Sequence, residues 1–145
     1  MSFKLRDYQA EDFPGVSEVW NETGMGNTAR GDSNLIIENT LKAGGRLIVI
    51  ENYETGEIAG TSWITNDARR LYLHHFGIKP DYQGKGLSGM LLEESLKFAR
   101  ELGLQIKLEV HRSNEIAINL YKKFGFSYLG DYYIFIIRDF EALVI

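Results

Sequence analysis

Apolar and polar residues follow first a strand-like and then a helix-like spacing along the first third of the chain. Residues 3–9 alternate between the two classes, which predicts an edge strand. Residues 11–22 and 34–43 have helical spacing, and Asp32 or Ser33 is in position to cap the second helix. The chain is therefore expected to begin with one strand followed by two helices.

The middle of the chain carries a loop and then three strand patterns. Thr23–Gly31 is rich in glycine and polar residues, which predicts a mobile loop. Leu47–Glu51 and Glu57–Ile64 are mainly apolar runs on either side of the turn-like Asn52–Gly56, so they predict a β-hairpin. Leu71–Ile78 predicts a third strand directly after this hairpin.

The second half of the chain combines helical patterns with short strand patterns. Apolar residues recur along one stripe of each helix, which is typical of helices that cover a sheet. The predicted elements are a helix at Gly86–Leu102, a buried strand at Ile106–Val110, a helix at Asn114–Phe124, and a hairpin of Phe126–Leu129 and Tyr132–Ile137 around Gly130-Asp131.

This order of elements predicts one domain built on a single mixed sheet. The order is β-α-α-β-β-β-α-β-α-β-β, in which the early hairpins imply antiparallel pairs and the later β-α-β unit implies a parallel pair. We therefore expect an α/β (α+β) fold with a mixed, mostly antiparallel central sheet and helices on both faces. The chain has 145 residues, the usual length of one domain, and residues 1–145 are expected to form it.

The amino-acid composition limits which binding partners and which cellular location we expect for the protein. Sixteen basic and 20 acidic residues give a net charge of −4, which argues against a broadly basic nucleic-acid-binding surface. The longest aliphatic run, Leu47–Ile50, is too short for a membrane span, and the N-terminal residues lack an apolar secretion signal. The absence of cysteine excludes disulfides, zinc–thiolate sites and a cysteine nucleophile, and the three histidines lack metal-ligand spacing. We therefore expect a cytoplasmic protein without a metal, nucleic-acid or membrane partner.

A glycine-rich stretch, Gly84–Gly89, has the Gly-x-Gly-x-x-Gly spacing of dinucleotide-binding loops. Three features argue against a nucleotide-dependent oxidoreductase. Five residues separate the glycines from the strand that ends at Ile78, 83 residues precede them, and the 56 residues that follow cannot complete a doubly wound sheet. Backbone N–H groups at Gly86–Gly89 would still suit a pyrophosphate, with a helix dipole behind them. A tight turn that needs glycine only for its positive φ is the structural alternative.

Two blocks of the sequence resemble the GCN5-related N-acetyltransferase (GNAT) family. The first is similar to the family's acetyl-CoA loop, Gln/Arg-x-x-Gly-x-Gly/Ala, with Ser88 where glycine or alanine is usual; it reads Ile78-x-Pro80-Asp81-Tyr82-Gln83-Gly84-Lys85-Gly86, followed by Leu91-Leu92. The second resembles the branch that acetylates the N-terminal amine of a ribosomal protein; it reads Leu108-Glu109-Val110-His111-Arg112-Ser113-Asn114, then Ala117, Leu120-Tyr121 and Gly125-Phe126. The resemblance covers about residues 45–138 and implies a GNAT-like fold.

The resemblance also implies an activity. The chain would transfer the acetyl group of acetyl-CoA to a primary amine by direct attack in a ternary complex, and the absence of cysteine agrees because it excludes a cysteine acyl-enzyme. Recognition of the acceptor is expected in Asn21–Ser33 and in the last predicted hairpin. The identity of the amine and a homodimer are left open, and a non-catalytic acyl-CoA-binding module is the main alternative.

Cofactor contacts follow from the same resemblance. Backbone groups of the strand before the glycines would pair with the pantetheine, and the loop and the following helix would hold the phosphates. Asn114 would contact the cofactor and could also cap its helix. The expected cofactor-binding residues are Phe76, Gly77, Ile78, Gln83, Gly84, Lys85, Gly86, Leu87, Ser88, Gly89, Asn114 and Tyr121.

The transfer needs an acid for the leaving thiolate and a base for the amine. The resemblance assigns the acid to Tyr121, for which the alternative is a core tyrosine. Glu109 is the first candidate base, because it lies twelve residues before Tyr121, as the base does in the ribosomal-protein branch, and a partly dry cleft would raise its pKa. His74 is the second, since its ordinary pKa of about 6.5 needs no change, whereas His75 is expected to face the other side of the sheet. Water is the third.

Overall fold

The computed structural model describes residues 2–26 and 31–144, so part of the loop predicted at Thr23–Gly31 lies outside the described residues. The chain forms two compact units, residues 1–111 and residues 112–145. Whether both belong to the one domain predicted from the chain length stays a prediction.

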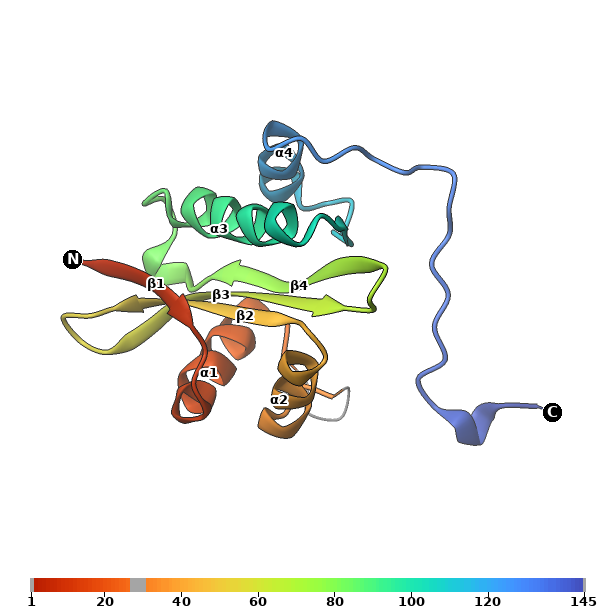
Figure 1. Ribbon diagram of the computed structural model, residues 1–145, viewed down its shortest axis with the longest axis horizontal. Helices are drawn as coiled ribbons and strands as arrows, with labels where there is room; N and C mark the ends of the chain where they lie inside the picture. The colour runs from red at the N-terminus through yellow and green to blue at the C-terminus, as the bar shows by residue number, and fades with distance from the viewer. Residues whose placement is uncertain (1, 27–30, 145) are drawn as a thin grey trace. The chain divides into compact units, whose positions relative to one another are not determined.

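The first unit is built on a five-stranded sheet in the order β1-β2-β3-β4-β5 (Figure 1). The pairs β1–β2, β2–β3 and β3–β4 are antiparallel, whereas β4–β5 is parallel. The predicted mixed, mostly antiparallel sheet and its edge strand are therefore confirmed. The strands are β1 Phe3–Asp7, β2 Arg46–Asn52, β3 Glu57–Asn66, β4 Arg70–Ile78 and β5 Gln105–Leu108.

Helices cover both faces of this sheet, as predicted (Figure 1). The helices α1 Phe13–Thr23 and α2 Asn34–Lys42 lie on one face, and α3 Leu87–Leu102 lies on the other. On the first face, Trp20 of α1 stacks on Trp63 of β3 with ring centroids 5.5 Å apart. On the second face, the Ser95 hydroxyl of α3 meets that of Ser62 at 2.7 Å in a buried hydrogen bond. The helix α3 connects β4 to β5, the crossover that a parallel pair requires.

Local capping chemistry sets the start of α2. The Ser33 side chain accepts a hydrogen bond from the Ile36 N–H, so Ser33 rather than Asp32 caps this helix. Asp32 is buried, and its carboxylate lies 3.1 Å from the ring Nε2 of His75 instead. The tertiary contact thus decided between two residues that are equally good caps by sequence.

The second unit contains the helix α4 Glu115–Lys123 and a short 3₁₀ turn, η4 Phe140–Ala142. The Asn114 side chain caps α4 by accepting a hydrogen bond from the Ala117 N–H at 3.2 Å. Gly125 follows the helix with φ = 101°, the left-handed conformation predicted for it.

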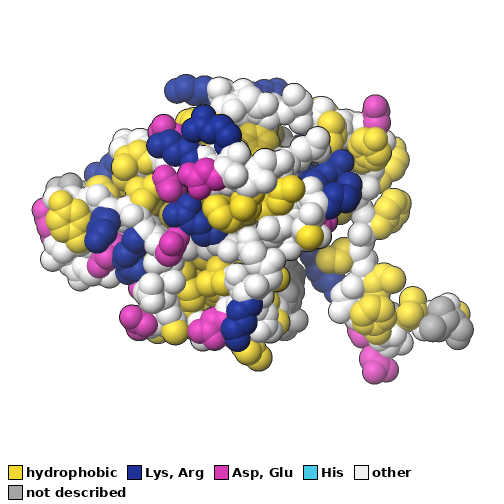
Figure 2. All heavy atoms as spheres, viewed as in Figure 1, with side chains coloured by type: hydrophobic (Ala, Val, Ile, Leu, Met, Phe, Trp, Pro, Cys, Tyr) yellow, Lys and Arg dark blue, Asp and Glu magenta, His cyan; other side chains and the backbone are white. Residues whose placement is uncertain are grey.

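The hairpin predicted at Phe126–Leu129 and Tyr132–Ile137 is wrong. Neither segment forms a strand in the described part of the second unit, and their aromatic and aliphatic side chains are mostly exposed (Figure 2). Residues 132–137 are apolar on both faces of a would-be strand, so such a strand needs neighbours on both sides. An isolated two-stranded hairpin is at best marginally stable. The local pattern therefore does not suffice to form it.

Among the residues that the structure describes, none of the helices combines the length and the apolar character needed to span a bilayer.

Candidate active site

A β-bulge in β4 determines which side chains share one face of the sheet. The register of β3 against β4 shifts between Thr61 and Trp63, and His75 has φ = 44°. Because the bulge breaks the alternation of side chains, the rings of His74 and His75 both lie near Trp63, with centroids 6.2 and 5.2 Å from its ring. The expectation that His75 faces the opposite side is therefore wrong.

His74 is held by neighbours on its own strand and on β3. Its Nε2 is 2.8 Å from the Thr65 hydroxyl, and its ring stacks on that of Tyr72 with centroids 4.3 Å apart. Burial, with a smaller contribution from His75, lowers the pKa of His74 to about 4, against the opposing charge of Glu109. The ring is therefore uncharged at neutral pH, and it is a much weaker base than its ordinary pKa implies.

Tyr72 joins the two candidate bases, and the sequence reasoning did not single it out. Burial raises the pKa of Tyr72 above its ordinary value, and a hydrogen bond to Glu109 adds to the shift. The parallel register places Tyr72 opposite Lys107, two residues before Glu109. Glu109 itself is exposed, one residue beyond the end of β5, rather than in a dry cleft. The one available signal was that Tyr72 and His74 are two residues apart on one strand.

The carboxyl end of β4 carries the backbone groups expected to meet a cofactor. The pairing of β4 with β5 runs from Arg70 opposite Gln105 to Leu73 opposite Leu108 and goes no further. On its other side, β4 remains paired with β3 through Gly77 and Ile78. The segment from Phe76 to Ile78 therefore lies beyond the stretch in which β4 and β5 pair, as an added extended ligand would require.

Described residues of the segment Asn21–Ser33 reach this end of β4, among them Met25 and Asp32. Met25 lies against Gly77, where a Cβ atom would come within 2.8 Å of the Met25 Cε. Asp32 lies beside His75, as described above. The part of the chain expected to recognise an acceptor thus borders the bulge on the face that carries His74.

The glycine loop leads from β4 into the start of α3. The Gln83 side chain donates a hydrogen bond to the Ile78 carbonyl at 2.9 Å and so ties the loop to the strand. Gly84 and Gly86 have φ = 79° and 78°, which agrees with the turn interpretation of these glycines. Open space surrounds both, because an added Cβ atom would meet nothing within 4 Å.

The N-terminus of α3 is suited to an anion. Gly86 is the N-cap and offers no side chain to the first N–H groups of the helix. Leu87 is buried in the core, so only its backbone faces the loop, while Ser88 and Gly89 are half-buried and Lys85 is exposed. Backbone N–H groups and the helix dipole together favour a phosphate at this position.

Asn114 and Tyr121 belong to the second unit. The Tyr121 ring packs edge-on against Phe126, with centroids 5.6 Å apart. Burial raises the pKa of Tyr121 to about 12, so its hydroxyl keeps its proton at neutral pH. That protonation state is the one an acid needs, and its role stays a prediction.

No group of three or more His, Asp or Glu side chains in residues 2–26 and 31–144 is arranged to hold a metal ion.

Comparisons with known proteins agree on one family. The sequence profile described as "Acetyltransferase (GNAT) family" matches residues 4–126. The chain is 31% identical over 105 residues to a mycothiol acetyltransferase of Propionibacterium freudenreichii, a match that covers 69% of this chain and 33% of that protein. It is 43% identical over 58 residues to the N-alpha-acetyltransferase RimI of Mycobacterium tuberculosis, covering 40% of this chain and 35% of that protein. The chain thus spans about a third of the length of both relatives.

The fold has close counterparts among solved structures. An acetyltransferase from Streptococcus agalactiae superimposes with a TM-score of 0.78 at 21% identity, over 94% of this chain and 93% of the other. At this identity the likeness concerns the fold. It confirms the mixed-sheet architecture, and the sequence profile confirms the family inferred from the two motifs.

Proposed function

From the premise that this chain belongs to the acetyltransferase (GNAT) family, we propose that it is an enzyme that transfers the acetyl group of acetyl-CoA to a primary amine by direct attack in a ternary complex. The observation that carries this proposal is the continuity of β4. This strand carries Tyr72 and His74 beside Glu109, extends beyond its pairing with β5, and leads through the glycine loop to the N-terminus of α3, which has no side-chain cap. One strand thus supports both an amine site and a cofactor site.

The donor would lie along the carboxyl half of this path. Its pantetheine would add to the edge of β4 at Phe76–Ile78, and its phosphates would accept hydrogen bonds from the backbone N–H groups of Gly86–Gly89. The same strand edge would present an N–H group to the thioester oxygen, where negative charge develops during attack. The hydrogen bond between Gln83 and Ile78 supports this arrangement because it sets the loop geometry before the cofactor arrives.

Glu109 is the base that we infer. Its side chain is exposed, where an ammonium group can approach it, and it is hydrogen-bonded to Tyr72. His74 is enclosed by its neighbours, and with its pKa lowered to about 4 it loses the advantage as a base that its ordinary value would give. A better role for His74 is to hold Tyr72 in place by stacking, while the Thr65 hydroxyl fixes its own ring. Glu109 would accept the proton directly or through water, and Tyr121 would return one to the CoA thiolate.

Acetyl-CoA is expected to raise the melting temperature of the protein, whereas NADH is not. At 100 times its Kd, acetyl-CoA should stabilise the fold by about 2.7 kcal/mol, because it binds only the folded state. Thermal unfolding with each ligand, followed by calorimetric titration, measures this effect. Folded protein that gives no binding heat and no shift with millimolar acetyl-CoA would overturn the proposal.

Glu109→Gln is expected to lower kcat by about 10²-fold, the lower end of the range for a positioned base. The residual rate should rise with pH, because a larger share of the acceptor is then already deprotonated. His74→Ala, the matched comparison, should lose less than about tenfold, since the proposed role of this ring is to hold Tyr72 in place by stacking rather than to accept the proton. Steady-state kinetics with an acceptor found by screening for CoA release would measure both variants. A slow His74→Ala enzyme beside a normal Glu109→Gln enzyme would assign the base to His74 instead.

A further inference from the structure

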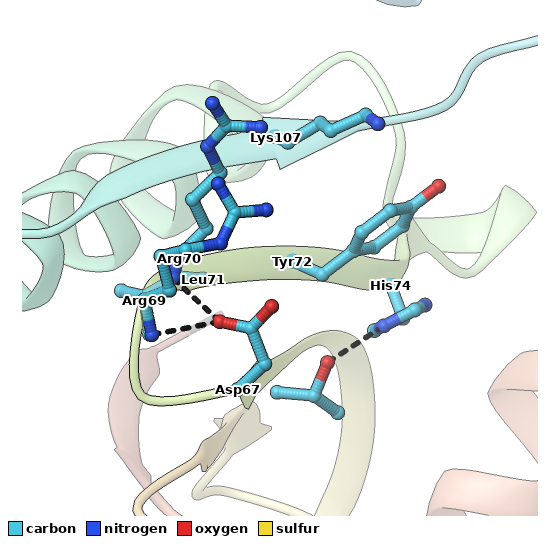
Figure 3. Close-up of a pocket in the computed structure, with 8 residues that line it drawn as sticks. Asp67, Arg69, Arg70, Leu71, Tyr72, His74 and Lys107 are labelled. Carbon is cyan, nitrogen blue, oxygen red and sulfur yellow. Dashed lines mark hydrogen bonds between the residues drawn. The ribbon is translucent and has the colours of Figure 1, made fainter.

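A cavity of about 280 Å³ opens beside the candidate amine site, at the amino-terminal end of β4 (Figure 3). Tyr72 and His74 line one part of it, and the turn between β3 and β4 lines another. Three cations also line the cavity: Arg69 of that turn, Arg70 at the start of β4, and Lys107 of β5. The cavity thus runs from the candidate catalytic side chains towards a group of three cations.

The three cations form no close ion pair within the part of the chain that the structure describes, although the charges of Arg69 and Arg70 contribute to the lowered pKa of Asp67. No carboxylate among the described residues forms an ion pair within 4.0 Å of Arg69, Arg70 or Lys107, although ion pairs of this kind occur elsewhere in the molecule. With three cationic side chains and one carboxylate, the lining carries a net positive charge, which favours an anion.

Asp67, the one carboxylate in the cavity lining, already serves the turn. Its Oδ1 accepts hydrogen bonds from the backbone N–H groups of Arg69 and Arg70, at 2.8 and 2.6 Å. These bonds lower the pKa of Asp67, so it stays ionised and stays bound to the turn. Figure 3 shows the carboxylate directed at this backbone, with both guanidinium groups extending away from it. The side chains that carry positive charge therefore remain available to a ligand.

We propose that this cavity binds an anionic group, a carboxylate or a phosphate, carried by the amine acceptor itself. This inference rests on the proposed function and adds the substrate class. His74 lies four residues after Arg70, which is roughly 13 Å along the strand, and the long basic side chains shorten the path to an anion. The acceptor would therefore carry its anion on the order of 10 Å from its amine. The stacked rings of Tyr72 and His74 offer an apolar wall to the chain between them.

The test compares acceptors that differ only in the distal group: 8-aminooctanoate, 8-aminooctyl phosphate and 8-amino-1-octanol. For the wild type, the KM of at least one anionic acceptor should be about tenfold lower than that of the alcohol, since charge-assisted hydrogen bonds stabilise its complex. In Arg70→Gln and Lys107→Gln, the ratio of the two KM values should fall towards one with little change in kcat, because the anion lies far from the reacting atoms. The two anions distinguish carboxylate from phosphate recognition.

Arg100→Gln is the control, because Arg100 is an exposed cation on α3 and not part of the cavity lining. It should leave the KM ratio unchanged, which separates the cavity from an effect of net charge. Equal KM values for the three acceptors in the wild type, or a ratio that none of the cavity variants changes, would overturn the inference while the transferase activity stands.

If none of the amines is acetylated, the proposed function fails at that point and the cavity is tested directly. NMR titration of the wild type with octanoate and with inorganic phosphate should then shift the signals of Arg70 and Lys107. The corresponding shifts should be lost in Arg70→Gln. A spectrum that neither anion perturbs would overturn the inference independently of activity.

Discussion

Gly86→Val is expected to weaken acetyl-CoA binding by about 100-fold or more, equivalent to about 2.7 kcal/mol, while the protein stays folded. Gly86 has φ = 78°, and the space in front of it is open. A valine side chain would therefore not clash with the protein itself. It would occupy the space where the phosphates approach the first N–H groups of α3, and it would press the backbone out of the left-handed region.

Gly103→Val provides a matched control for the cost of the backbone. Gly103 lies at the other end of the same helix, has φ = 70°, and is also surrounded by open space. Both variants should lose stability by a similar amount, on the order of 1–2 kcal/mol for a left-handed residue with a side chain. Only Gly86→Val should lose binding. Isothermal titration of both folded proteins measures this, and unchanged affinity in Gly86→Val would show that the glycine serves the turn alone.

Tyr121→Phe is expected to lower kcat by about 10²–10⁴-fold with little change in the Kd of acetyl-CoA. The substitution removes one oxygen, so the edge-on contact of the ring with Phe126 should survive. What is lost is a hydroxyl whose pKa of about 12 keeps it protonated at neutral pH and able to donate to the leaving thiolate. Tyr128→Phe is the control in the same unit, because Tyr128 is 88% exposed, and it should behave as the wild type.

The kinetic experiment must identify the step that Tyr121 serves. Steady-state kcat and the Kd of acetyl-CoA are measured for both tyrosine variants, followed by single-turnover kinetics with the fastest acceptor available. Single-turnover measurement isolates acetyl transfer when product release limits the steady-state rate. A Tyr121→Phe enzyme that transfers at the wild-type rate in a single turnover would exclude the acid role and leave the tyrosine a core residue.

Local sequence patterns were sufficient to predict a helix or strand wherever that element packs its own apolar face within the sheet layers. The helix predicted at Gly86–Leu102 is α3 almost residue for residue, and the strands on either side of the turn Asn52–Gly56 pair as expected. The same locality explains the failure of the last hairpin. Its apolar residues specify a strand, but a strand forms only where a partner supplies hydrogen bonds, and the described part of the second unit supplies none.

The candidate site likewise combines features that the sequence predicts with features that only the tertiary structure decides. By itself, the sequence determined the family, the glycine loop and the candidate acid and bases, because these depend on residue identity and spacing along the chain. Only the tertiary structure decided that the bulge brings His75 beside Trp63, that burial weakens His74 as a base, and that Tyr72 connects to Glu109. Register shifts, burial and charge proximity are properties of pairs of strands, and no single stretch of sequence encodes them.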